Sequence, residues 1–201
     1  MRYVMALRVE VRGPVPARPF LLVSNHLGYI DVLTLASVVD AVFVAKADVY
    51  EWPMLGSMVK VFDTIFVDRE NAKGIVQANM AIESALQRGE GLVLFAEGTS
   101  SNGQEILPLK SSLLEGAVRG SHPVHYASIS YHTPKGETSA RTSVCWWGDM
   151  EFMPHLFNLF KLPGFSASIT FGPEPVSGND RKVLAERLRE LIHQQHVPVP
   201  G

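Results

Sequence analysis

Short apolar runs alternate with stretches of helical periodicity through the first half of the chain. Runs of this length bounded by polar or turn residues are typical of buried strands. They are Phe20–Val23, Val42–Ala45, Thr64–Val67 and Leu92–Phe95. Before them, residues Ala6 to Val11 alternate between apolar and charged side chains, which predicts a half-exposed strand.

Helical spacing of apolar side chains fills the intervals between these runs. The clearest case extends from Asn71 to Arg88, and Gly89 stands where a helix commonly ends. Shorter helices are predicted after Asp31 and from Trp52-Pro53 to Val61, and a last helix begins near Asn179-Asp180. Strands that alternate with helices predict an α/β fold. We expect a single domain over residues 1–201, with a mixed, mainly parallel central sheet flanked by helices.

The second half of the chain is less regular. Val124–Ser130, Thr142–Trp146 and Ser168–Phe171 are predicted strands. The apolar segment Met150–Leu162 has two interpretations. It is either a helix packed on the core or an apolar surface that touches a bilayer or lines an acyl channel.

Composition narrows the class of protein. Hydrophobic residues make up 46% of the 201 residues and charged residues 19%, which is enough apolar material for a sizeable core. The net charge is −2 and no run of Lys or Arg occurs, so nucleic acid is not an expected partner. The single cysteine, Cys145, is expected to be a small buried residue. No apolar segment reaches the roughly 18 to 20 residues of a membrane span, and the N-terminus does not resemble a signal peptide.

The stretch Asn25–Asp31 carries the most suggestive chemistry. His26 follows a predicted strand, and Asp31 precedes the apolar positions of a helix. A histidine has a pKa near neutrality, and a carboxylate can hold its tautomer, so the two could act as a base and its orienting partner. This requires His26 to stand before the helix, within hydrogen-bond reach of Asp31. The alternative is a helix-capping Asp beside an unrelated surface His.

Two further polar residues follow predicted strands: Arg69 and Glu97. Open α/β sheets bind their ligands beyond the carboxyl ends of the strands, so we expect these residues near His26. The loop Glu97–Ser101 offers backbone N–H groups and hydroxyls to an anion, although an ordinary polar loop has the same composition. Likewise, Arg69 could simply pair with Asp68. The remaining histidines lack metal-ligand spacing, so no metal is predicted.

Taken in order, these segments resemble the motifs of the glycerolipid acyltransferase family, the lysophosphatidate (1-acylglycerol-3-phosphate) acyltransferases. The matching segments are Asn25–Asp31, Phe66–Arg69 and Phe95–Ser101, with a weaker match at Pro123-Val124 and a basic segment at Leu107–Lys110. The resemblance extends from about Arg8 to the last helix. It implies the family's α/β fold and transfer of a fatty acyl group from acyl-CoA or acyl carrier protein to the hydroxyl of a lysolipid, with no cofactor.

The resemblance also implies residue roles. His26 would be the general base and Asp31 would orient it. Arg69 and Lys110 would hold an acceptor phosphate. The remaining expected substrate-binding residues are Asn25, Glu97, Gly98, Thr99 and Ser100.

Some positions depart from the family's pattern. Ala96 stands where proline is usual and Ser100 where arginine is usual, and loss of that arginine removes a candidate phosphate ligand. The Thr-Ser-Ser sequence with Asn102-Gly103 is closer to the branch that acylates lyso-ornithine lipids, whose acceptor carries no phosphate. In the weaker fourth segment, Tyr126 stands where a second proline is common.

The chain begins about two dozen residues before His26, so the hydrophobic N-terminal helices of many members are missing. Either the chain is trimmed or the protein is peripheral, and we expect a cytoplasmic protein at the inner face of the membrane. Two other functions remain open. One is a non-catalytic lipid- or acyl-binding module with this fold, and the other is an acyl-thioester hydrolase.

Overall fold

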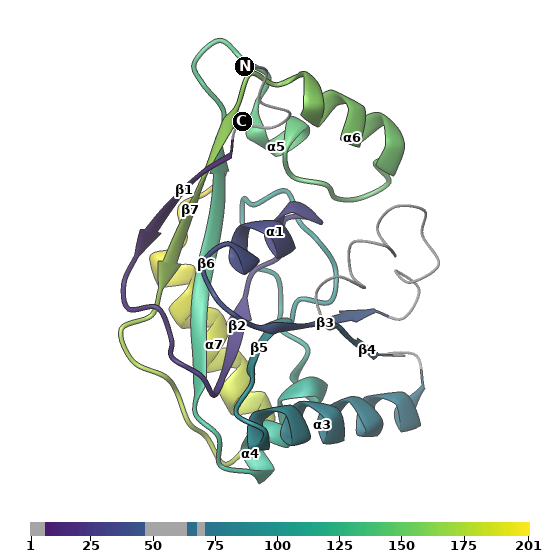
Figure 1. Ribbon diagram of the computed structural model, residues 1–201, viewed down its shortest axis with the longest axis vertical. Coiled ribbons are helices and arrows are strands. Elements are labelled where there is room, and N and C mark those ends of the chain that lie inside the picture. The colour runs from purple at the N-terminus through teal and green to yellow at the C-terminus, as the bar shows by residue number, and fades with distance from the viewer. Residues whose placement is uncertain (1–6, 47–63, 68–70) are drawn as a thin grey trace.

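A computed structural model describes residues 7–46, 64–67 and 71–201. The described strands form one sheet in the order β1-β7-β6-β2-β5-β3-β4 (Figure 1). All neighbouring strands are parallel except β6 and β7, which are antiparallel. The strands are β1 (Leu7–Arg12), β2 (Phe20–Ser24), β3 (Val42–Lys46), β4 (Thr64–Val67), β5 (Gly91–Phe95), β6 (Val124–His132) and β7 (Phe165–Phe171). The predicted α/β fold with a mainly parallel sheet is confirmed.

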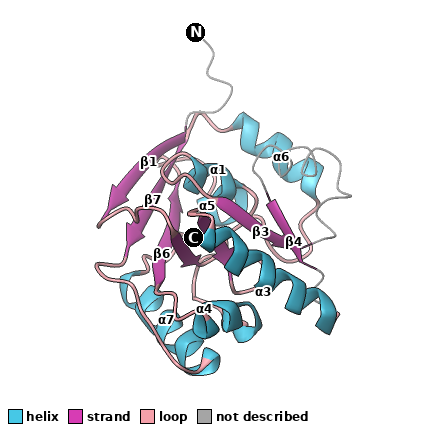
Figure 2. Ribbon diagram, turned by 60° about the horizontal axis from the view of Figure 1, so that its bottom comes forward, coloured by secondary structure: helices cyan, strands magenta, loops and turns pink. Residues whose placement is uncertain are grey.

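Helices cover both faces of the sheet. They are α1 (Ile30–Ala36), α3 (Ala72–Gln87), the 3-10 helix η2 (Ser111–Leu114), α4 (Glu115–Arg119), α5 (Ala140–Ser143), α6 (Phe152–Lys161) and α7 (Arg181–Gln195). In Figure 1, α1, α5 and α6 lie above β3 and β4, whereas α3 and α4 lie below them. Figure 2 shows α3, α4 and α7 gathered on one side of the sheet.

The two central strands explain why the sequence alternates between these elements. Every residue of β2 and β5 is buried, as expected for parallel strands that are covered on both faces. Leu21 packs into one apolar cluster with residues of α3 and α7, whereas its neighbour Leu22 packs into the other with residues of α1. The alternation of side chains along a strand therefore divides the core between the two faces.

Two helix starts were predictable from their caps. The side chain of Asn71 accepts a hydrogen bond from the backbone N–H of Lys73, and that of Asp180 accepts two from Lys182 and Val183. Both residues use side-chain oxygens on the unpaired N–H groups of a helix start. Gly89, with φ of +84°, follows α3 where the chain turns back toward β5.

One predicted strand is wrong. Thr142–Trp146 is β-branched and aromatic, yet it contributes to the short helix α5 and the turn after it. Ser139 caps that helix by accepting from the backbone N–H of Arg141, and no strand of the described sheet pairs with the segment. The backbone N–H of Trp146 donates instead to Leu27, at 2.8 Å. Local composition indicated a strand, whereas tertiary contacts determined the fold here. The predicted helix from Trp52-Pro53 to Val61 lies outside the described residues.

The segment Met150–Leu162 combines features of both interpretations. It forms α6, whose residues His155 and Leu159 are buried. Met153, Phe157 and Phe160 are 41%, 60% and 45% exposed. Their spacing of four and three residues places them on one face of the helix, away from the core. The helix is therefore packed on the core along one side and apolar toward the outside along the other. Within the described chain, no helix is long and apolar enough to cross a membrane.

Candidate active site

Two parallel strands end side by side beneath the candidate site. Ser24, the last residue of β2, pairs with Phe95, the last residue of β5. His26 and Glu97 each lie two residues beyond this pair, and so they meet at one edge of the sheet. Such an edge is where open α/β sheets bind ligands. The expected proximity of these two residues is confirmed.

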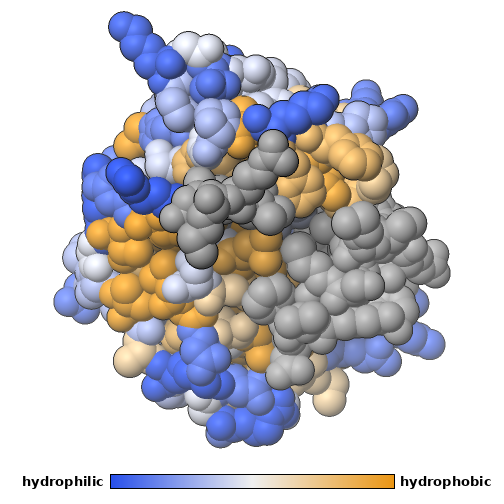
Figure 3. Space-filling model, turned by 45° about the horizontal axis from the view of Figure 1, so that its top comes forward, coloured by the Kyte–Doolittle hydropathy of each residue, from blue (hydrophilic) through white to orange (hydrophobic). Residues whose placement is uncertain are grey.

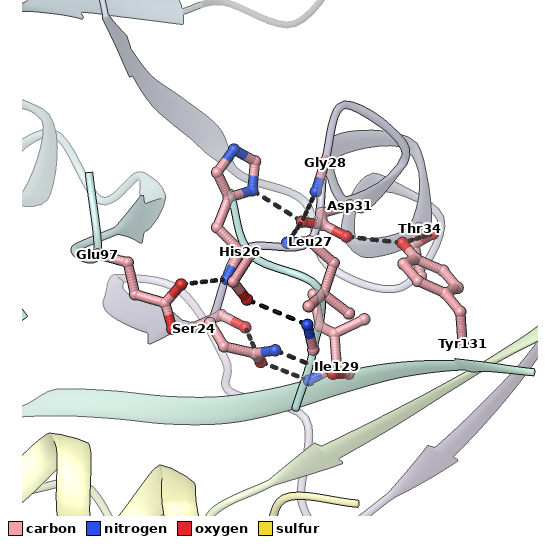
Figure 4. A network of polar contacts seen from close by, with 12 residues as sticks. Ser24, His26, Leu27, Gly28, Asp31, Thr34, Glu97, Ile129 and Tyr131 are labelled. Atoms are coloured by element: carbon pink, nitrogen blue, oxygen red, sulfur yellow. Dashed lines mark hydrogen bonds and ion pairs between the residues drawn. The ribbon is translucent and has the colours of Figure 1, made fainter. Parts of the chain in front are cut away.

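The imidazole of His26 is held along its edge and across its face. Its Nδ1 lies 2.7 Å from Oδ2 of Asp31, and its ring stacks on Phe95 with centroids 4.3 Å apart and planes inclined by 20°. Because a carboxylate only accepts, Nδ1 carries the proton of that bond and Nε2 is left as the basic nitrogen. The side chain is 23% exposed, and no partner for Nε2 is found among the described residues. Figure 4 shows the ring projecting away from β6.

Asp31 is a fully buried carboxylate with a donor on each oxygen. Besides His26, Oδ2 accepts from the backbone N–H groups of Leu27 at 2.6 Å and Gly28 at 3.0 Å. Oδ1 accepts from the Tyr131 hydroxyl at 2.8 Å. Asp31 is the second residue of α1, so His26 stands before the helix and reaches a side chain in its first turn. The geometric requirement for a base and its partner is met.

The loop between His26 and Asp31 depends on glycine at position 28. Gly28 has φ of +151°, and a Cβ there would lie 2.9 Å from the backbone nitrogen of Trp146. Any larger residue would push the loop away from the turn after α5. This close approach lets Trp146 donate to Leu27 and lets Gly28 donate to Asp31.

Asn25 fastens the start of the same loop to β6. Its Oδ1 accepts from the backbone N–H of Ile129 at 2.7 Å, and its Nδ2 donates to the carbonyl of Ile129 at 3.0 Å. The side chain is 1% exposed. Asn25 was expected to bind substrate, but both ends of its amide are engaged with the backbone. A direct binding role would require these bonds to open.

Glu97 joins the loop after β5 to the backbone of His26. Its Oε2 accepts from the N–H of His26 at 3.3 Å, and its Oε1 accepts from that of Leu107 at 3.2 Å. The carbonyl of His26 accepts from the N–H of Ser101 at 2.8 Å. The backbone of His26 is thus held on both sides by one loop. Burial raises the pKa of Glu97 to about 8, although its two backbone hydrogen bonds favour the charged form.

The other expected binding residues lie on the same loop or close to it. Gly98 has φ of +78° and turns the chain, Thr99 is exposed and Ser100 is half-buried. Lys110 is exposed, and its backbone N–H donates to the carbonyl of Ala96 at 2.8 Å. Its backbone therefore runs beside Glu97. Arg69 lies outside the described residues, although β4 ends at Val67 on the same edge of the sheet. In residues 7–46, 64–67 and 71–201, no cluster of three or more His, Cys, Asp or Glu side chains could hold a metal ion.

A buried polar contact connects this loop to α6. The hydroxyl of Tyr29 lies 3.0 Å from Nδ1 of His155, whose Nε2 lies 3.0 Å from the carbonyl oxygen of Cys145. Since a carbonyl only accepts, Nε2 is the protonated nitrogen and Nδ1 accepts from Tyr29. Burial lowers the pKa of His155, which keeps this neutral form. The inner face of α6 therefore rests directly on the residue before α1.

The sequence did not identify Tyr131, Phe95 and Thr34 as parts of the site. Phe95 was named only as the end of a predicted strand and the start of a matching segment, and Thr34 was not singled out. Tyr131 is 100 residues from Asp31 in the chain and stands in an apolar strand, so no local pattern connects the two. Side-chain alternation along β6 could have placed it on the same face as Ile129.

Comparison with known proteins bears on this site. The model of a family described as Acyltransferase matches residues 7–130. A lyso-ornithine lipid O-acyltransferase from Rhizobium meliloti is 35% identical over 96% of this chain and 69% of its own. The enzyme of the same name from Brucella abortus is 34% identical over 87% and 70%. A 1-acyl-sn-glycerol-3-phosphate acyltransferase from Neisseria gonorrhoeae is 27% identical over 92% and 72%.

A solved structure has the same fold. The 1-acyl-sn-glycerophosphate acyltransferase PlsC from Thermotoga maritima superposes with a TM-score of 0.62 at 18% identity. The alignment covers 92% of this chain and 69% of that one.

Proposed function

This chain belongs to the acyltransferase family, and we propose that it transfers a fatty acyl group from a thioester, acyl-CoA or acyl carrier protein, to the hydroxyl of a lysolipid, with His26 as the general base. The observation that carries this proposal is the pairing of a partly exposed His26 with a fully buried Asp31 at the carboxyl edge of the sheet. The arrangement leaves Nε2 as the basic nitrogen of a partly exposed ring, which suits abstraction of a hydroxyl proton.

The reaction needs one proton carrier and two bound substrates. Nε2 of His26 takes the proton as the acceptor oxygen attacks the thioester carbonyl. The carbon–sulfur bond then breaks, and the thiolate leaves with the proton returned by the imidazolium. Asp31 stabilises that imidazolium through Nδ1. Base catalysis of this kind contributes about 10² to 10⁴ in rate, and positioning of the substrates must contribute more.

We propose a lyso-ornithine lipid as the preferred acceptor. Ser100 replaces the arginine that is usual in the family and so removes one cation suited to a phosphate. Relatives at 34% and 35% identity carry the name lyso-ornithine lipid O-acyltransferase, which supports the same choice. A lysophosphatidate acceptor is the competing assignment, with Arg69 and Lys110 as its phosphate ligands and Glu97, Gly98 and Thr99 shaping the site.

The protein is further proposed to work peripherally on the cytoplasmic face of a membrane, because its acceptor is a lipid. The exposed apolar residues of α6, namely Met153, Phe157 and Phe160, support this. The helix α6, like any α-helix, is about 10 to 12 Å across. Its buried side contacts Tyr29 in the loop that carries His26. A bilayer that contacts the outer side would therefore lie near the site. Figure 3 shows apolar side chains on the surface at the end of the molecule where α6 lies.

One mass-spectrometric assay separates the candidate functions. Labelled acyl-CoA and acyl carrier protein are offered with lyso-ornithine lipid or lysophosphatidate to the wild type and to His26→Ala. We expect acylated ornithine lipid from the wild type and a loss of about 10² to 10⁴ in turnover from His26→Ala. His193→Ala, which removes an exposed histidine of α7, serves as the control and should keep full activity.

Each alternative has its own outcome in that assay. Wild-type turnover by His26→Ala would refute the mechanism. Free fatty acid as the main product in the presence of acceptor would indicate a thioester hydrolase. Lipid or acyl-CoA binding without thiol release would indicate a non-catalytic module. Efficient transfer to lysophosphatidate would reassign the acceptor.

A further inference from the structure

One side chain outside the expected motifs reaches the Asp31 carboxylate. Tyr131 is fully buried on β6, and its hydroxyl donates to Oδ1 of Asp31 at 2.8 Å. Figure 4 shows it approaching Asp31 from the side opposite His26. Oδ2 has three donors, His26, Leu27 and Gly28, whereas Tyr131 is the partner found for Oδ1 among the described residues.

The direction of the hydrogen bonds around Tyr131 follows from its single hydroxyl proton. Thr34 Oγ1 lies 3.0 Å from the Tyr131 oxygen. Since Tyr131 uses its proton on the carboxylate, Thr34 must be the donor in that contact. A chain of bonds therefore extends from Thr34 through Tyr131 and Asp31 to His26. Bonds in such chains polarise and strengthen one another in a buried environment.

Tyr131 is suited to this task because it is rigid and remains protonated. Its ring packs edge-on against Phe165 at a centroid distance of 6.0 Å, within the antiparallel pair of β6 and β7. Burial raises the pKa of Tyr131, and the charge of Asp31 raises it further. The hydroxyl is therefore a fixed donor across the working pH range. By contrast, α1 has only seven residues and gives Asp31 little support of its own.

We propose that Tyr131 is a positioning residue of the acyl-transfer reaction: it orients the Asp31 carboxylate and thereby the His26 base. The inference rests on the proposed function, because it assigns a role within the same site. Without the hydroxyl, Oδ1 would become a buried acceptor without a partner, and the carboxylate would be free to rotate away from Nδ1. Tyr131 does not itself contact the reacting atoms.

The titratable groups around Asp31 come from four segments of the chain, and all of them bear on a pH profile. They are His26 on the loop before α1, Tyr131 on β6, Glu97 after β5 and Cys145 after α5. The variant Tyr131→Phe changes one of them and keeps the ring. A carboxylate that loses a hydrogen-bond donor holds protons more tightly. We therefore expect the acid limb of the kcat/KM profile to move to higher pH in this variant.

The test compares three variants with the wild type. Tyr131→Phe should lower kcat by about ten- to a hundredfold, the range found when the hydrogen-bond partners of metal-ligating side chains are removed, and leave KM nearly unchanged. Thr34→Val removes the donor to Tyr131 while the bond to Asp31 remains, so a smaller loss of kcat is expected. Tyr126→Phe is the matched control, because it deletes the hydroxyl of the other tyrosine on β6. It should behave as the wild type.

A second readout does not depend on turnover. The proton shared by Nδ1 and Asp31 should give a low-field proton resonance in the wild type, which weakens or shifts in Tyr131→Phe and persists in Tyr126→Phe. A variant Tyr131→Phe with wild-type kcat, pH profile and resonance would overturn the inference and leave the proposed function standing. Full activity in His26→Ala would instead refute the proposed function. If Tyr131→Phe fails to fold, an unchanged kcat and resonance in Thr34→Val would overturn the proposed chain of bonds.

Discussion

Replacing Asn25 by alanine tests how the loop that carries His26 is held in place. The side chain of Asn25 forms two hydrogen bonds with the backbone of Ile129, of 2.7 and 3.0 Å. Parallel pairing of β2 with β6 extends to Ser24 and Ala127. Asn25 continues this pairing with its side-chain amide in place of its backbone. Asn25→Ala removes the continuation and leaves the backbone of Ile129 facing a void.

The expected cost follows from the two groups that lose their partners. A buried donor or acceptor left unsatisfied costs about 1 to 3 kcal/mol. For the N–H and the carbonyl of Ile129 together, the free energy of unfolding should fall by about 2 to 6 kcal/mol. Typical domains are stable by about 5 to 15 kcal/mol, so the loss would be a large part of the total.

The substitution Asn25→Asp should make the stability of the protein depend on pH. A charged carboxylate keeps an acceptor for the N–H of Ile129 but places its second oxygen against the carbonyl of Ile129. A protonated carboxyl can donate to that carbonyl. The pKa of the introduced carboxyl should therefore be higher in the folded state than in the unfolded state. Its stabilising effect is then present at low pH and is lost as pH rises through the folded-state pKa.

The assay is urea unfolding followed by the fluorescence of the three tryptophans, at pH 5 and pH 7. Asn158→Ala, on the exposed side of α6, serves as the control and should stay within about 0.5 kcal/mol of the wild type. A wild-type unfolding free energy for Asn25→Ala would refute the structural role. If that variant also raised KM for the lysolipid, Asn25 would be a substrate ligand, as its motif implies.

Two further predictions concern charge and membrane contact. Burial raises the pKa of Glu97 from 4.5 to about 8, so stability gained from the protonated form is complete below 4.5 and is lost as pH rises toward 8. We therefore expect the difference in unfolding free energy between the wild type and Glu97→Gln to fall by up to about 1.4 kcal/mol per pH unit across this range. Urea titrations at several pH values measure this difference, and a difference that stays constant with pH would contradict the prediction. Replacing both Phe157 and Phe160 by serine should weaken sedimentation with phosphatidylcholine–phosphatidylglycerol vesicles by about tenfold or more. Burial of the exposed part of each ring in the bilayer would contribute about 1 kcal/mol of binding free energy. Val183→Ser, at a position of α7 that is 68% exposed, should leave sedimentation unchanged, and an equal loss from it would argue against α6 as the contact.

The site could be located from the sequence because parallel strands follow simple rules. Two apolar runs, Phe20–Val23 and Leu92–Phe95, were expected to be buried strands, and a parallel sheet brings the carboxyl ends of its strands to one edge. His26 and Glu97 follow directly from these ends. The pairing of His26 with Asp31 was also open to inference, because only four residues, one of them Gly28, lie between the two and leave few ways to connect a strand to a helix. The outward-facing apolar side of α6 was one of two interpretations of its segment.

The rest of the site depends on contacts between distant parts of the chain. Tyr131 reaches Asp31 across 100 residues, and Asn25 reaches Ile129 across 104. Such contacts depend on strand order, which local periodicity does not encode. The prediction for Thr142–Trp146 fails for the same reason: its side chains favour a strand, but none of the described strands pairs with this segment. The expected role of Arg69 rests on the sequence alone, because Arg69 lies outside the described residues.

The contacts around His26 fall into two groups, which should respond differently to mutation. Asp31 and Phe95 touch the imidazole itself, so changing how they meet the ring should lower kcat more than it lowers stability. Asn25 and Glu97 hold the backbone before and at His26 through buried hydrogen bonds from β6 and the loop after β5. Their loss should lower stability and activity together, since the ring moves with the loop. Tyr131 belongs to the first group by its action on Asp31, although it lies in the core. A variant set that separates kcat from unfolding free energy would therefore distinguish orientation of the base from support of its loop.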